Sequence, residues 1–168
     1  DWRLHATGSI VRDVKVITPK PMNSSALPGE PQDAAELYPV LARSGAEYGP
    51  AFQAMRQIWR AKSSAWSRVE LSEAAGPPDA YRVHPALLDA AFQTLSAALP
   101  QPDDDTGDIY LPVDMGRLDV FRSPAGKAWV HASVEIPTAH PETLTANLVL
   151  YAGHGQCAVT LERLTLKR

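Results

Sequence analysis

The stretch PALLDAAFQTLSAAL, residues 85–99, constrains the fold more than any other part of the sequence. It carries apolar residues on nearly every side of a helix: Leu87, Leu88, Ala90, Ala91, Phe92, Leu95, Ala98 and Leu99. A helix without a polar face is buried all round. Pro85 suits a first helical turn, and His84 just before it is expected to have a structural role at the helix end. The sequence therefore predicts a central helix that the rest of the chain encloses.

Most of the remaining chain has the pattern of β-strands separated by short turns. Two strands are expected within 51–72, with a turn near 62–64, and further strands at 109–113, 116–122, 128–136, 143–152 and 156–167. A short helix is predicted at about 33–44, with Asp33 as N-cap and Gly45 past its end. These elements predict an α+β fold, an antiparallel sheet wrapped around a central helix.

The N-terminal part has a different organisation. Residues 2–12 alternate loosely and predict one strand, whereas 18–32 are rich in Pro, Ser and Gly and predict a linker. A lone strand cannot bury its own face. Residues 1–17 are therefore expected to pair with the later sheet or to end a preceding domain, and 33–168 to form the main domain. The absence of an initiator Met suggests a piece of a longer chain.

Composition excludes several classes of protein. The net charge is −3 with both signs interspersed, and no basic patch suggests nucleic-acid binding. No apolar run approaches the length of a membrane span, and the N-terminus does not resemble a signal peptide. Cys157, the only cysteine, is expected to be an inert core thiol, which fits the reducing cytoplasm.

Asp89 is the main candidate for chemistry, because it is a carboxylate inside the apolar helix. Asp89 and Gln93 are spaced i, i+4 and share a helix face. An unpaired buried carboxylate responds by raising its pKa, which is what a general acid requires near neutral pH. The Gln93 amide could hold the acid or a substrate hydroxyl. The alternative is that Asp89 caps backbone N–H groups or reaches solvent.

A second candidate is the segment YGPAF, residues 48–52. Gly49 permits unusual dihedral angles, Pro50 fixes its own, and Tyr48 offers a hydroxyl, so the segment could line a pocket. The alternative is a tight turn that enters a strand. None of the five histidines has the spacing of a metal site, and the acidic run 103–105 lacks the other ligands of a Ca²⁺ loop, so no metal is expected.

Several segments together resemble the dehydratase domain of modular type I polyketide synthases. HPALLDAAFQ, residues 84–93, is similar to that family's HPALLDAALQ helix motif, and GAEYGPAF, residues 45–52, to its G-Y-x-Y-G-P-x-F motif. YLPVDMGRLDVF, residues 110–121, is similar to the L-P-x-x-x-x-R-L segment, and LERLTLKR to the end of such domains. The resemblance covers about 45–168 and is specific as a set.

The resemblance implies a double hot-dog fold, in which two sheets each enclose a helix. It implies removal of water from a β-hydroxyacyl chain on acyl carrier protein, with Asp89 as general acid and Gln93 as its companion. Tyr48, Gly49 and Pro50 would line the site, and Leu111 and Pro112 would flank it. Expected partners are acyl carrier protein and neighbouring synthase domains. No cofactor is expected beyond the carrier's phosphopantetheine, and a homodimer is open because the family commonly dimerises.

The departures from the family pattern concern the other half of the site. The family's first half carries a histidine in an H-x-x-x-G-x-x-x-x-P motif, which His5 fails because Ser9 stands where the glycine should be. WRLHATGSIV instead resembles the last strand of that half, and Ala46 replaces a motif tyrosine. The chain is therefore expected to be the C-terminal hot-dog half, inactive alone. The alternatives are a cyclising or isomerising relative, or an acyl-binding scaffold.

Overall fold

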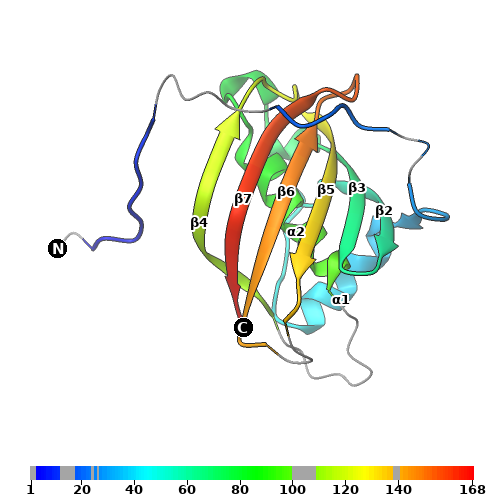
Figure 1. Cartoon of the computed structure of the whole chain (residues 1–168). Coiled ribbons are helices and arrows are strands. Elements are labelled where there is room, and N and C mark those ends of the chain that lie inside the picture. The colour runs from blue at the N-terminus through cyan, green and yellow to red at the C-terminus, as the bar shows by residue number, and fades with distance from the viewer. Residues whose placement is uncertain (1–2, 12–17, 24, 26, 100–108, 138–140) are drawn as a thin grey trace.

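A seven-stranded antiparallel sheet forms the body of the molecule, with the strand order β1-β2-β3-β5-β6-β7-β4 (Figure 1). The computed structural model describes residues 3–11, 18–23, 25, 27–99, 109–137 and 141–168. The strands are β1 (Gln32–Asp33), β2 (Met55–Ala61), β3 (Ser64–Glu70), β4 (Leu111–Val120), β5 (Lys127–Glu135), β6 (Thr143–Tyr151) and β7 (Cys157–Lys167). The helices are α1 (Leu37–Arg43) and α2 (Pro85–Ala98), with short 3-10 turns at Ala34–Glu36, Glu73–Ala75 and Pro78–Ala80.

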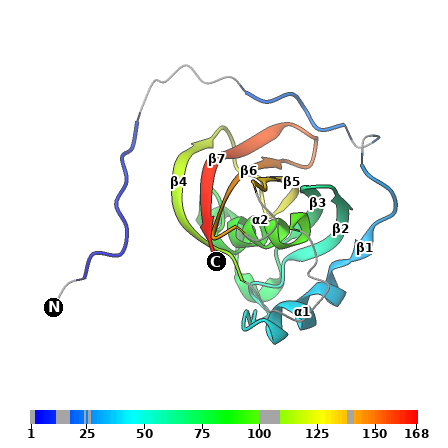
Figure 2. The same ribbon diagram turned by 60° about the horizontal axis from the view of Figure 1, so that its bottom comes forward.

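The sheet curls around α2, as the second view shows (Figure 2). Alternate residues of β5 and β6 are buried, so one face of the sheet points at the helix. α2 packs mainly against β2, β3 and β5, and the core consists of aliphatic side chains from these strands and the helix. The expected α+β hot-dog architecture is thereby confirmed.

The N-terminus of α2 is built by the residues that the sequence indicated. His84 is the N-cap, and its Nδ1 accepts a hydrogen bond from the backbone N–H of Ala86 at 3.2 Å. Pro85 occupies the first turn, where its missing N–H costs nothing. The structural role expected for His84 is confirmed.

The prediction that α2 is buried all round is wrong on one side. Leu88, Asp89, Phe92 and Ser96 are only half-buried, and they follow one another at helical spacing. The sheet covers the opposite side of the helix through residues such as Leu87 and Thr94. A stripe of α2 therefore remains within reach of other molecules, and Asp89 belongs to it.

Four predicted elements differ in the structure. Residues 3–11 are exposed and form no strand, because no edge of the sheet pairs with them. The segments 109–113 and 116–122 form one strand, β4, with an irregularity between Pro112 and Asp114. The first helix starts as a 3-10 turn, in which Asp33 Oδ1 accepts the N–H of Ala35 at 2.9 Å. The acidic run 103–105 lies outside the described residues.

In the described part of the linker predicted at 18–32, the strand β1 begins at Gln32, the last residue of that range. The linker is tied to the sheet where the backbone N–H of Met22 donates to the carbonyl of Gly155, at 2.8 Å, in the β6–β7 turn. Cys157 is buried, as expected for a core thiol. In the part of the chain that the structure describes, no helix is long and apolar enough to cross a membrane.

Candidate functional site

Asp89 lies in the second turn of α2, on the half-buried side of the helix. Burial raises the pKa of its carboxyl above the ordinary value, and a hydrogen bond from Gln93 opposes that rise. In this bond Gln93 Nε2 donates to Asp89 Oδ2 at 2.7 Å. The pKa shift expected from the sequence therefore has the expected direction and cause.

Gln93 is buried, with 3% of its surface exposed, and its amide is fully engaged. Nε2 also donates to the carbonyl oxygen of Phe52 at 3.0 Å, and Oε1 accepts from the hydroxyl of Tyr38 at 3.3 Å. Asp89 accepts from this side chain and from no backbone N–H within the described residues, so the capping alternative for Asp89 is not observed. The i, i+4 pair is a preorganised unit.

The segment 48–52 forms the tight turn that was the alternative to a pocket-lining role. Its Tyr48 also interacts electrostatically with the Asp89 carboxyl. The backbone N–H of Phe52 donates to the carbonyl of Gly49 at 2.9 Å, which closes the turn. The Tyr48 ring packs edge-on against Tyr38, with centroids 6.2 Å apart. Burial raises the pKa of Tyr48, and the negative charge of Asp89 adds to that rise. Gly49 and Pro50 are exposed, and Gly49 does not use a positive φ.

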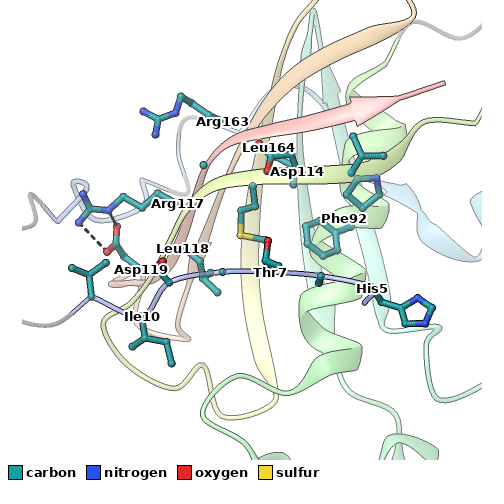
Figure 3. Close-up of a pocket in the computed structure, with 18 residues that line it drawn as sticks. His5, Thr7, Ile10, Phe92, Asp114, Arg117, Leu118, Asp119, Arg163 and Leu164 are labelled. Atoms are coloured by element: carbon teal, nitrogen blue, oxygen red, sulfur yellow. Dashed lines mark hydrogen bonds and ion pairs between the residues drawn. The ribbon is translucent and has the colours of Figure 1, made fainter. Parts of the chain in front are cut away.

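Leu111 and Pro112 lie at the start of β4 and are exposed. No hydrogen bond or ion pair joins either residue to Asp89 within the described ranges. Pro112 lines a groove of about 1270 Å³ whose walls are residues 5–11, 112–119 and 163–164 together with Phe92 (Figure 3). Asp89 is not among the lining residues, but it is three positions before Phe92 and so lies next to it on the helix surface.

Figure 3 also places His5 along this groove, on the exposed segment 3–11. The groove carries an ion pair between Arg117 and Asp119, with Nε and Oδ2 2.6 Å apart. Tyr38 is the residue of the site that sequence reasoning missed. It lies on α1, outside every motif, and the structure reveals it through its hydrogen bond to Gln93.

Comparison with known proteins decides the family. The sequence model described as "Polyketide synthase dehydratase N-terminal domain" matches residues 19–168. The chain belongs to the polyketide synthase dehydratase family. Polyketide synthase GfsE of Streptomyces halstedii is 34% identical over 138 residues, which cover 79% of this chain and 4% of GfsE. The chain thus spans a small part of such synthases.

Solved dehydratases support the same fold. The dehydratase domain of the CurJ module of the curacin polyketide synthase superposes with a TM-score of 0.78 at 19% identity, covering 90% of this chain and 54% of that domain. An inactive Asp-to-Asn mutant of the CurK dehydratase is 31% identical with a TM-score of 0.70, covering 82% of this chain and 48% of that one. An inactive His-to-Phe mutant of CurK has also been solved. This chain therefore corresponds to about half of each dehydratase domain.

Proposed function

We propose that this chain is the C-terminal hot-dog half of a polyketide synthase dehydratase, in which Asp89 is the general acid. The observation that carries the proposal is the half-buried carboxyl of Asp89, whose pKa is raised by burial and whose Oδ2 is held by Gln93. A carboxyl that stays protonated closer to neutral pH can donate a proton to a leaving hydroxyl. A scaffold without chemistry would not require this arrangement.

The assignment to the C-terminal half rests on motifs. The matched family model is described by its N-terminal domain, whereas this chain contains the HPALLDAAFQ segment and lacks H-x-x-x-G-x-x-x-x-P. The coverage of about half of each solved dehydratase fits one hot-dog of a pair. CurK is inactive as an Asp-to-Asn mutant and as a His-to-Phe mutant, which fits one acidic and one histidine partner.

In the proposed reaction a histidine of the other half removes the α-proton of a β-hydroxyacyl thioester. The electron pair of that C–H bond forms the α,β double bond while the bond between the β-carbon and oxygen breaks. Asp89 gives its proton to the departing hydroxyl, which leaves as water. The histidine gains one proton and Asp89 loses one, so proton exchange with solvent restores both groups. Both transfers use side chains, and the substrate would arrive on the phosphopantetheine of acyl carrier protein, from neighbouring synthase domains.

The test is Asp89→Asn in the dehydratase that contains both halves, assayed with a β-hydroxyacyl thioester on acyl carrier protein. Loss of a general acid is expected to slow dehydration by about 100-fold or more, with the fold retained. Asp79→Asn is the matched control, because Asp79 is exposed in a turn before α2. Wild-type turnover by Asp89→Asn would remove Asp89 from the mechanism.

The isolated chain is expected to show little or no dehydration, because proton abstraction and hydroxyl protonation need both groups on one substrate. Addition of the other half should restore activity. Product analysis separates the related alternatives: an unsaturated thioester supports dehydration, whereas a cyclised or isomerised product would assign the chain to a non-dehydrating relative.

A further inference from the structure

Tyr38 connects α1 to the acid of α2, although it belongs to none of the family motifs. It is the second residue of α1 and is half-buried. Its hydroxyl accepts a hydrogen bond from the backbone N–H of Met55 at 3.0 Å and donates one to Gln93 Oε1 at 3.3 Å. Met55 begins β2, so the hydroxyl joins a helix, a strand and the central helix.

The backbone N–H of Met55 fixes the direction of the hydrogen bonds that run from Met55 through Tyr38 to Gln93. A backbone N–H can only donate, so the hydroxyl oxygen of Tyr38 accepts from Met55 and its own proton points to Gln93. Gln93 Oε1 is then the acceptor, which turns the amide nitrogen towards Asp89 Oδ2 and the carbonyl of Phe52. The flipped amide would place its oxygen against these two acceptors.

The orientation of the Gln93 amide determines which carboxyl oxygen of Asp89 carries the proton. Because Oδ2 of Asp89 accepts an N–H, the proton of the neutral carboxyl is held on Oδ1, the oxygen that Gln93 does not engage. We propose that Tyr38 is a positioning residue that locks the Gln93 amide and thereby places the transferable proton of Asp89 on Oδ1. The catalytic meaning of this inference rests on the proposed function, but the hydrogen-bond relay does not.

The side chains around Asp89 fit a series of hydrogen bonds between uncharged groups. Among the described residues, Tyr38 on α1 and Tyr48 in the loop before β2 interact electrostatically with Asp89. Burial raises the pKa of both tyrosines, so both hydroxyls keep their protons near neutral pH. Arg56 on β2 interacts with Tyr38 and partly opposes the rise in its pKa.

The test is the titration of Asp89 by carboxyl-carbon NMR in the 168-residue chain, which needs no turnover. In Tyr38→Phe the Gln93 Oε1 loses its donor and the amide is oriented by the Phe52 carbonyl alone, so it donates less to the carboxylate and the pKa of Asp89 should rise further, by roughly 0.5 to 1 unit. Tyr110→Phe is the matched control, because it also removes a half-buried hydroxyl, which donates to the carbonyl of Pro141 at 2.6 Å. That variant should leave the Asp89 titration unchanged.

A double-mutant cycle decides whether Tyr38 acts through Gln93. Gln93→Met should itself raise the pKa of Asp89, and adding Tyr38→Phe should then produce no further rise. An equal rise in both backgrounds, or no rise in Tyr38→Phe, would overturn the inference. If Gln93→Met does not fold, the comparison of Tyr38→Phe with Tyr110→Phe decides alone.

Activity gives an independent second readout in the dehydratase containing both halves. Tyr38→Phe should lower kcat and move the basic limb of the pH profile of kcat/KM upward by the same shift as the titration, because the active form of Asp89 is protonated. If Asp89→Asn stays active, the proposed function fails. The NMR titration still tests whether Tyr38 orients the Gln93 amide.

Discussion

At the scale of single residues, Asp89 places function in conflict with stability. Its folded-state pKa is raised above the ordinary value of 3.8. The carboxyl is protonated in both states at pH values well below 3.8, where it costs the fold nothing. As pH rises, the unfolded state ionises first, so stability falls until the folded-state pKa is passed.

Asp89→Asn should therefore melt at a higher temperature than the wild type at pH 7, with the advantage vanishing below about pH 3.8. The Asn oxygen can still accept the Gln93 N–H, so the geometry survives. Thermal melts from pH 3 to pH 8 measure the difference, with the exposed Asp79→Asn as the control. A variant less stable than the wild type at pH 7 would contradict the account of the raised pKa.

The local part of the site could be predicted from the sequence, and the remote part could not. Asp89 and Gln93 are four residues apart in one helix, so their proximity follows from helix geometry alone. Tyr38 is 55 residues away from Gln93 in sequence, and their hydrogen bond depends on how α1 docks beside β2. No periodicity encodes that docking. The sequence also left open whether Gly49 would use its conformational freedom, and in the structure the turn closes without a positive φ there.

At the scale of elements, alternation located β5, β6 and β7 within one residue at either end. It failed at β4, where Gly116 was taken as the start of a second strand. A Cβ at Gly116 would lie 2.8 Å from Arg163 Nε, so the glycine makes room for that side chain inside a continuous strand. It failed also at 3–11, because alternation does not say whether a partner strand exists.

Helix α2 and strand β3 are joined by a buried pair of hydroxyls. Thr94 Oγ1 donates to the carbonyl of Ala90 at 2.9 Å, so Ser67 Oγ is the donor in the 2.6 Å bond between the two hydroxyls. Thr94→Val leaves the Ser67 hydroxyl without an acceptor, whereas Ser67→Ala leaves Thr94 with Ala90. We expect costs of about 2 and 1 kcal/mol, respectively, in the free energy of unfolding.

Urea unfolding of the two single variants and the double variant checks this asymmetry. In the Ser67→Ala background, Thr94→Val should lower the free energy of unfolding clearly less than it does alone, because no Ser67 hydroxyl is left without an acceptor. Equal costs in both backgrounds would show that the hydroxyl pair does not couple α2 to β3.

At the scale of the whole molecule, β4 is the exposed margin of the sheet (Figure 1). Among the described strands it pairs with β7 alone, and it exposes four large apolar side chains to 62% (Leu111), 60% (Val113), 37% (Met115) and 44% (Leu118). An apolar edge strand is a template for pairing with another chain. The chain covers about half of the CurJ dehydratase domain, and in the proposed double hot-dog the other half would cover this edge.

Without that half, we expect the isolated chain to associate with itself through β4, in a concentration-dependent way. Val113→Lys should weaken the association at least tenfold, because a lysine at an edge strand carries a charge that cannot be buried between two copies. Val40→Lys makes the same substitution at a residue of α1 that is 38% exposed, and it should not alter the association. Sedimentation velocity over a concentration series measures both. Association of Val113→Lys as strong as that of the wild type would place the contact elsewhere, and a wild-type chain that stays monomeric would show that β4 needs no cover.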